Sequence, residues 1–178
     1  MDYSAIAVRY SKALFTLAEE KGILDDIQND FGLIKSVYEF EPEFRRMLQF
    51  PVIASTKKVE IFNILFSGRV NKLSFEFLGL LAHKRRESYL YQIILDFQKL
   101  YKEKKGIKTI SFTSVVDISE SDRKAIRAIM NTKYGTNIEI IEQTDNRLIG
   151  GFILRIDDEQ YDASVSRHLE NIKRSFKA

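Results

Sequence analysis

Residues capable of acid–base or metal chemistry are few in this 178-residue chain and form no recognisable set. The chain has no cysteine and only two histidines, His83 and His168, which are far apart in the sequence. A metal site would therefore have to be built from carboxylates alone. No nucleophile, base and orienting group can be assigned together. We expect no catalytic residue, no bound metal and no cofactor.

Two short segments resemble ligand-binding loops. Gly150 and Gly151 could approach a phosphate, but a phosphate loop leads from a strand into a helix, whereas strand-like residues follow here. We interpret the pair as a bulge or a positive-φ kink at the start of a strand. Residues 157–162 include four acidic side chains, yet their spacing departs from the EF-hand loop and the glycine of its sharp turn is missing. We expect a solvated hairpin at that position.

A run of three cations, Lys84, Arg85 and Arg86, could have either a structural or a binding role. At the end of a predicted helix they would complement its dipole, but three in succession would also suit an anionic partner. The sequence leaves both interpretations open. The net charge is only +3 and neither half of the chain is strongly basic, whereas nucleic-acid binders usually concentrate positive charge. We therefore expect no nucleic-acid partner.

The composition is that of a globular protein. Hydrophobic residues make up 44% and charged residues 30% of the chain, which argues against extensive disorder. No stretch is long and apolar enough to span a bilayer, and the first residues lack the features of a signal peptide. We expect a protein that is cytosolic or peripheral on a cytosolic membrane face.

The elements that would position any site are helices in the first part of the chain. Six apolar stripes with three- and four-residue steps occur between residues 6 and 101. The residues expected to interrupt them are Gly22, Pro42, Pro51 and Gly68. Ser55 or Thr56 should cap the fourth helix and Asn71 the fifth. We predict an antiparallel six-helix bundle over residues 1–105.

After Gly106 the apolar period changes from about 3.6 to 2. Ile110 and Phe112 alternate with polar residues and predict a strand, and Ser119 opens a helix. The inward residues expected of that helix are Ile126, Ile129 and Met130. Strands at 138–140 and 152–156, a turn at 157–160 and a last helix complete a strand–helix–strand–strand–helix domain over residues 106–178. The boundary and a hinge should lie within residues 102–106, and so small a domain should be marginally stable alone.

Four segments in order resemble the delta subunit of F-type ATP synthases, the bacterial relative of the mitochondrial oligomycin-sensitivity-conferring protein. They are Tyr10–Ala18, Leu48–Ile53, Phe77–Arg86, and Leu148–Phe152 with the following Tyr161–Val165. Gly150, Gly151, Asp162 and Ser164 form the structural motif of the last segment. The chain departs from the family at Ser11, where alanine is usual, at Ala163, where glycine is usual, and at Ser166, where a basic residue is usual.

The resemblance implies a non-catalytic stator subunit of the peripheral stalk. Such a subunit links the catalytic alpha/beta hexamer to the membrane-anchored b stalk, so that rotor torque drives ATP synthesis coupled to proton transport. The implied partners are the N-terminal segments of alpha subunits and the C-terminal end of the b subunit, with one copy per complex. The implied location is the cytoplasmic face of the inner membrane, with membrane association only through the complex.

The resemblance also implies two sets of partner-binding residues. The N-terminal domain would bind an alpha-subunit segment in a groove bordered by the first and fifth helices, with candidates Tyr10, Ala13, Leu14, Leu17, Phe77, Leu78 and Leu81. The C-terminal domain would meet the b stalk, with candidates Val165, Leu169, Ile172 and Phe176. Each of these apolar residues is also a candidate for ordinary packing, because every amphipathic helix buries one stripe.

Three alternatives share part of this reasoning. A helix-binding adaptor of unrelated function would have the same composition and patterning. A nucleic-acid-binding protein would use Lys84, Arg85 and Arg86, and its affinity would then depend steeply on salt. An enzyme is the alternative least favoured by the residues.

Overall fold

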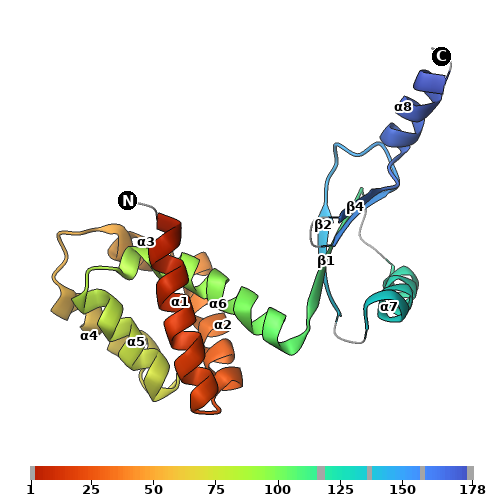
Figure 1. Ribbon diagram of the computed structural model, residues 1–178. Coiled ribbons are helices and arrows are strands. Elements are labelled where there is room, and N and C mark those ends of the chain that lie inside the picture. The colour runs from red at the N-terminus through yellow and green to blue at the C-terminus, as the bar shows by residue number, and fades with distance from the viewer. Residues whose placement is uncertain (1–2, 116–118, 136–137, 157–158, 176–178) are drawn as a thin grey trace. The chain divides into compact units, whose positions relative to one another are not determined.

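A computed structural model describes residues 3–115, 119–135, 138–156 and 159–175 of the chain (Figure 1). The chain divides into two compact units, residues 1–101 and 102–178. The division falls inside helix α6 (Leu90–Lys105), which ends before Gly106 at φ 64°. Residues 102–105, where the sequence suggests a hinge, are helical, so the hinge and the boundary after residue 105 stay predictions.

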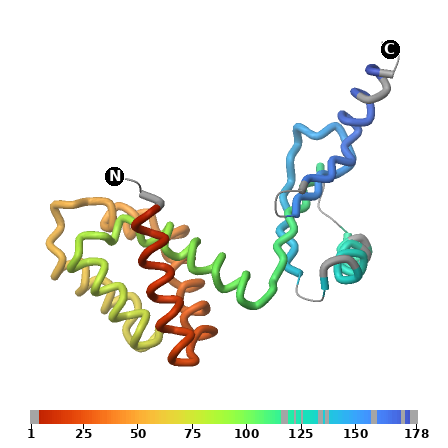
Figure 2. Tube along the Cα trace, in the orientation of Figure 1, coloured from red at the N-terminus to blue at the C-terminus, as the bar shows by residue number. Residues whose placement is uncertain are grey.

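The N-terminal unit is helical, as its apolar periodicity predicts. Its elements are α1 (Tyr3–Glu20), α2 (Leu24–Phe40), α3 (Pro42–Gln49), α4 (Ser55–Phe66), α5 (Lys72–His83), the 3-10 helix η1 (Glu87–Tyr89) and α6. Helices α4 and α5 pack side by side (Figure 2). A mainly helical fold with the expected short helix α3 is confirmed, whereas η1 was not expected and the antiparallel six-helix bundle stays a prediction. Within the described residues, no helix has the length and apolarity needed to cross a membrane.

Aromatic rings from four helices meet in the core of the N-terminal unit. Phe31 of α2 lies edge-on to Phe97 of α6, with ring centroids 4.9 Å apart. Phe15 of α1 contacts the same ring at 5.7 Å, and Phe77 of α5 lies 6.2 Å from Phe31. Edge-on and tilted aromatic pairs at these centroid distances stabilise a core beyond the area that they bury. The aromatic cluster therefore fixes α1, α2, α5 and α6 against one another.

Helix ends in the N-terminal unit follow local sequence rules, with one correction. Gly22 has φ 67° just after α1, as a glycine that ends a helix should. The Asn71 side chain caps α5 by accepting a hydrogen bond from the Leu73 N–H at 3.0 Å, as predicted. The predicted cap of α4 at Ser55 or Thr56 is wrong, because the helix begins at Ser55 and Ala54 occupies the capping position without a side-chain hydrogen bond.

A buried ion pair ties α4 to η1. The Lys58 and Glu87 side chains are 1% and 9% exposed, and the Lys58 ammonium donates to Glu87 Oε1. The same ammonium lies 3.5 Å from the Leu48 carbonyl oxygen at the end of α3. Three separate elements thus share one buried cation, whose charge is balanced by a single carboxylate.

The C-terminal unit contains a small mixed sheet. Its elements are β1 (Lys108–Ser114), α7 (Glu120–Tyr134), β2 (Ile138–Thr144), β3 (Phe152–Ile156), β4 (Glu159–Asp162) and α8 (Val165–Ser175). The strand order is β2-β1-β3-β4, with β1 and β2 parallel and the other neighbours antiparallel. The parallel pair is joined through α7, as a crossover requires.

Strand β4 corrects the predicted sequence of elements. Glu159 and Gln160 pair with Ile156 and Arg155 in a ladder rather than forming a turn. The segment has no alternating apolar pattern, because it is a four-residue edge strand whose ladder is made by backbone groups. The expected hairpin is present as the β3–β4 pair, and the expected turn residues Asp157 and Asp158 lie outside the described part of the chain.

The core of the C-terminal unit lies on the inner strands of the sheet. Among the residues whose burial the structure describes, the apolar core comprises Ile110, Phe112, Leu154 and Ile156. Ile126 and Met130 of α7 pack against this core as predicted, whereas Ile129 is 62% exposed and the prediction for it is wrong. On a helix, Ile126 and Met130 are four residues apart and share a face that Ile129 only borders.

The buried Lys58–Glu87 pair generates a stability prediction. Replacing Glu87 by alanine should destabilise the N-terminal unit by about 3–5 kcal/mol, because Lys58 is left buried without a counter-charge. Replacing both residues with apolar ones, as in Lys58→Met with Glu87→Leu, should cost far less or be stabilising. Urea unfolding followed by circular dichroism would measure both effects. Equal losses in the single and double variants would contradict the assignment.

Candidate helix-binding groove

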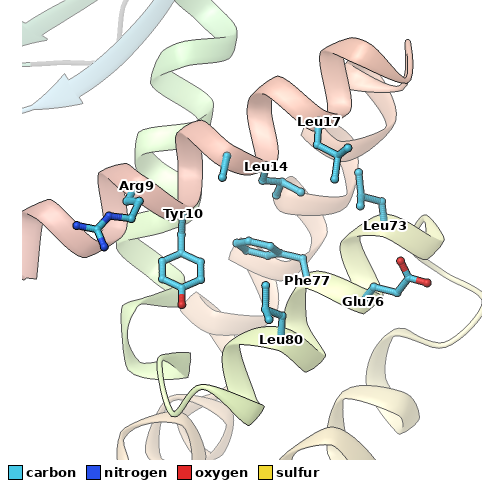
Figure 3. Close-up of a pocket in the computed structure, with 9 residues that line it drawn as sticks. Arg9, Tyr10, Leu14, Leu17, Leu73, Glu76, Phe77 and Leu80 are labelled. Carbon is cyan, nitrogen blue, oxygen red and sulfur yellow. The ribbon is translucent and has the colours of Figure 1, made fainter.

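A mainly apolar groove lies between α1 and α5 (Figure 3). It encloses about 390 Å³ and is lined by Arg9, Tyr10, Ala13, Leu14, Leu17, Leu73, Glu76, Phe77 and Leu80. The lining residues of α1 follow one another at steps of one and three, as do those of α5, so each helix contributes one continuous stripe. A groove of this kind can hold the apolar face of another helix.

The groove has a buried floor and exposed rims. Leu14 and Phe77 are only 3% and 7% exposed and form the floor, whereas Leu17 and Leu80 are 38% and 44% exposed. The Tyr10 ring lies edge-on to Phe77, with centroids 6.2 Å apart. Leucine side chains this exposed in a unit with a well-filled core are available for a partner.

Five of the seven residues suggested for this groove line it, namely Tyr10, Ala13, Leu14, Leu17 and Phe77. Leu78 and Leu81 do not, because they are at most 1% exposed and lie in the core. The resemblance suggested Phe77, Leu78 and Leu81 as one surface of the helix. In the structure Leu78 and Leu81 face the core, whereas Phe77 belongs to the core and also lines the groove.

Four lining residues were missed as groove residues: Arg9, Leu73, Glu76 and Leu80. On α5, Leu73, Glu76, Phe77 and Leu80 have steps of three, one and three, which is the spacing of one helix face. That stripe is visible in the sequence, but Leu73 and Leu80 were not among the groove candidates. Arg9 and Glu76 are charged, so the pattern of apolar residues could not identify them.

The start of α5 is held in place by a buried carboxylate of α2. Asp30 Oδ2 accepts hydrogen bonds from the Asn71 backbone N–H at 2.8 Å and from Ser74 Oγ at 2.6 Å. Asp30 is 9% exposed and Ser74 is fully buried. Because hydrogen bonds to a buried carboxylate are stronger than neutral ones, Asp30 fixes the end of the helix that carries Leu73 and Glu76.

The end of α5 is closed by the basic triplet. Arg85 has φ 54°, its N–H donates to the Ala82 carbonyl at 3.1 Å, and the Arg86 N–H donates to the Leu81 carbonyl at 2.8 Å. This is the hydrogen-bond pattern of a Schellman motif, with an arginine in the position that usually favours glycine. The Arg86 guanidinium also lies 5.9 Å from the centroid of the Tyr89 ring. These contacts give Arg85 and Arg86 structural roles at the helix end.

The second set of suggested partner residues lies on α8 of the C-terminal unit. Val165 and Leu169 are 41% and 46% exposed, four residues apart on the same helix face. The side chain of Ile172 and the whole of Phe176 lie outside the described part of the chain. A hollow of about 410 Å³ beside α8 is lined by Leu169 together with Ile149, Asp162, Ser164, Ser166, Arg167, Glu170 and Lys173.

The Gly150–Gly151 motif is a structural turn that positions α8. Gly151 has φ 78° directly before β3, which confirms the predicted kink. A Cβ atom added at Gly151 would lie 2.3 Å from the Ala163 carbonyl oxygen. The Gly150 carbonyl accepts a hydrogen bond from the Val165 N–H at 3.0 Å. The two glycines therefore let the chain before β3 pass against the start of α8.

Asp162 and Ser164 complete this turn. Asp162 Oδ1 accepts the Ser164 N–H at 3.0 Å, and Ser164 Oγ accepts the Arg167 N–H at 3.2 Å, which caps α8. Hydrogen bonding by Ser164 lowers the pKa of Asp162, and the nearby charge of Arg167 lowers it further. The carboxylate is thus the form that holds the turn together.

The remaining chemistry-bearing residues are isolated. His83 ends α5 and His168 lies on α8, and both are exposed. Among the residues that the structure describes, no group of three or more histidine and carboxylate side chains could hold a metal ion.

Comparisons with known proteins indicate one family over nearly the whole chain. The sequence model of the family described as ATP synthase delta (OSCP) subunit matches residues 6–176. A protein of Cytophaga hutchinsonii named ATP synthase subunit delta is 37% identical over 176 residues, covering 99% of this chain and 96% of that protein. A protein of the same name from Carboxydothermus hydrogenoformans is 33% identical over 172 residues, covering 97% of each.

Solved structures show the same fold. A chain in the cryo-EM structure of the Toxoplasma gondii mitochondrial ATP synthase hexamer matches with a TM-score of 0.77, covering 97% of this chain and 97% of that chain. The two sequences are 20% identical, so this likeness speaks for the fold alone.

Asp30 generates a prediction about the start of α5. Asp30→Ala should destabilise the N-terminal unit by about 2–3 kcal/mol, because the Asn71 N–H and the Ser74 hydroxyl lose their buried acceptor. Asp30→Asn keeps one acceptor oxygen and should cost less. Asp26→Ala, an exposed change in the first turn of the same helix, is the control and should cost less than about 1 kcal/mol. Urea unfolding that ranked the control with Asp30→Ala would refute this role.

Gly151 generates a prediction about the turn before β3. Gly151→Ala should destabilise the C-terminal unit by about 1–3 kcal/mol, because its positive φ and the Ala163 carbonyl both oppose a Cβ atom. Gly32→Ala is the matched control, since it lies inside α2 with open space around it and should stabilise by about 0.5–1 kcal/mol. Hydrogen exchange of the β3 and β4 amides would report the local loss. Unchanged protection in Gly151→Ala would show that the turn tolerates a side chain.

Proposed function

This chain belongs to the ATP synthase delta (OSCP) family of F-type ATP synthase peripheral-stalk subunits, and we propose that it ties the catalytic alpha/beta hexamer to the membrane-anchored b stalk. Its contribution to ATP synthesis is mechanical and non-catalytic. Rotor torque acts on the hexamer, and unless the hexamer is held it turns with the rotor. A subunit bound to both the hexamer and the stalk converts that torque into work on the catalytic sites.

The N-terminal unit supplies the connection to the hexamer. Its partner is the N-terminal segment of an alpha subunit, which binds as an amphipathic helix in the α1–α5 groove. The observation that carries this proposal is the open apolar groove, with a buried floor at Leu14 and Phe77 and exposed leucines at its rims. Apolar anchors at helical spacing are the usual basis of such recognition.

The C-terminal unit supplies the connection to the stalk. Its partner is the C-terminal end of the b subunit, and the contact surface includes the exposed Val165 and Leu169 of α8. The exposure of these two side chains supports the proposal, because a partner that covers α8 would remove their apolar surface from water.

Two separate contacts on one assembly strengthen each other. Once one unit is bound, the other is held at high effective concentration near its partner, so two modest interfaces give a durable connection. One copy per complex is sufficient for this role. The protein would lie at the cytoplasmic face of the inner membrane and associate with the membrane only through the complex.

The proposal is tested by binding of a peptide that copies the N-terminal segment of the alpha subunit. We expect micromolar or tighter binding, and at least a tenfold loss of affinity in Leu80→Asp, because a carboxylate at the groove rim must be desolvated by the apolar face of the peptide. Leu80 is 44% exposed, so the folded state should tolerate the change.

Ile64→Asp is the matched control. Ile64 is 81% exposed on α4 and does not line the groove, so this variant should bind the peptide like the unchanged protein. Isothermal titration of the three proteins separates the outcomes. The groove proposal fails if Leu80→Asp binds as tightly as Ile64→Asp, or if none of the three proteins binds the peptide.

A further inference from the structure

The apolar groove between α1 and α5 carries opposite charges at its two ends. Arg9 lies beside Tyr10 at one end, and Glu76 lies beside Leu73 at the other, with the Phe77 ring between them (Figure 3). Both charged residues line the groove, and the other lining residues are uncharged. The groove is thus marked positive at one end and negative at the other.

Both charges are available to a ligand. Among the residues that the structure describes, none forms an ion pair or hydrogen bond with the Arg9 side chain, which is exposed. Glu76 Oε1 lies 3.7 Å from Lys72 Nζ, one helical turn before it, and the two side chains are 58% and 88% exposed. An exposed pair of this kind is weak, so a partner's cation can take the place of Lys72.

The length of the groove sets the size of its occupant. The lining residues of α1 extend from Arg9 to Leu17, which corresponds to about 12 Å along the helix axis. A helix lying along the groove therefore contributes about two turns, or roughly eight residues. Its apolar anchors would lie at positions i, i+3 or i+4, and i+7.

Apolar contacts alone leave the direction of such a helix undecided. Burial of apolar surface is not directional, and a stripe of leucines fits the floor in either orientation. Charges at the rim of an interface contribute little affinity, but they penalise the wrong arrangement and so determine register and orientation.

We propose that Arg9 and Glu76 select an amphipathic partner helix by its charge order: an acidic side chain beside Arg9 and a basic one about two turns away beside Glu76. This inference rests on the proposed function, because it concerns the same groove. It makes Arg9 and Glu76 specificity-determining residues, while the leucines and Phe77 supply the affinity.

The experiment uses two synthetic amphipathic peptides of identical composition with the full chain. One carries glutamate at the amino-terminal end of its apolar stripe and lysine at the carboxyl-terminal end, and the other has the two exchanged. Each bears a nitroxide label at its amino-terminal end. We expect the label of the first peptide to broaden the nuclear magnetic resonance signals of Tyr10, and that of the second peptide to broaden those of Leu73.

The double variant Arg9→Glu with Glu76→Lys should exchange these two patterns. Each single reversal should weaken binding of either peptide by about threefold at low salt, and the effect should disappear at about 1 M salt, where exposed charges are screened. The matched control is Lys57→Glu with Glu60→Lys, which reverses an exposed pair 3.2 Å apart on α4. This control should leave both patterns and both affinities unchanged.

The outcomes separate the inference from the function on which it rests. If both peptides bind in the same direction, and the double variant does not reverse them, charge-based selection is overturned while the groove stands as a docking site. If neither peptide nor the alpha-subunit segment shifts the nuclear magnetic resonance signals of Phe77, the groove is not a docking site and the inference is wrong as well. The inference is supported if the double variant Arg9→Glu with Glu76→Lys exchanges the two broadening patterns and the control variant does not.

Discussion

The position of Phe77 connects the core of the N-terminal unit to its groove. The ring lies 6.2 Å from Phe31 on the core side and 6.2 Å from Tyr10 on the groove side, so one side chain belongs to both surfaces. Because α1 and α5 share this ring, the groove floor is as rigid as the aromatic core beneath it. A groove floor held by such packing would need little reordering on binding, which would lower the entropic cost of association.

Buried polar groups hold the start of α5 and the segment that follows the helix. At its start, Asp30 accepts hydrogen bonds from the backbone of Asn71 and from the side chain of Ser74. Just after its end, Glu87 in η1 pairs with the buried Lys58 of α4. Buried groups of this kind are costly when unpaired, so the first turn of α5 and the η1 segment after it are held in place. A subunit that resists torque benefits from such fixed elements, since a compliant connector would yield under the load that it must carry.

The C-terminal unit is built on a different principle. Its described core residues Ile110, Phe112, Leu154 and Ile156 come from strands β1 and β3, and α8 presents Val165 and Leu169 to solvent. Its order at the start of α8 comes from a turn, in which Gly151 passes close to Ala163 and Ser164 caps the helix. The turn fixes where α8 begins, while its apolar face stays available for a partner. Hydrogen bonds within a turn therefore position α8 in this unit, whereas aromatic packing positions the helices of the N-terminal unit.

The sequence by itself determined which segments become helices and strands. Apolar periodicity located α1 to α6 and the change of period at Gly106, and resemblance in four segments identified the family. It missed β4, whose ladder is made by backbone groups and leaves no apolar alternation. It also predicted the wrong cap for α4 and an inward position for Ile129, and it offered the buried Leu78 and Leu81 as groove candidates. Only the tertiary structure decided which stripe of α5 faces the core and which faces the groove, because adjacent stripes of an amphipathic helix have similar residues. The buried contacts of Asp30 and Glu87 and the positions of Arg9 and Glu76 in the groove lining were likewise decided by three-dimensional packing, since partners such as Asp30 and Ser74 lie on different helices and no local spacing brings them together.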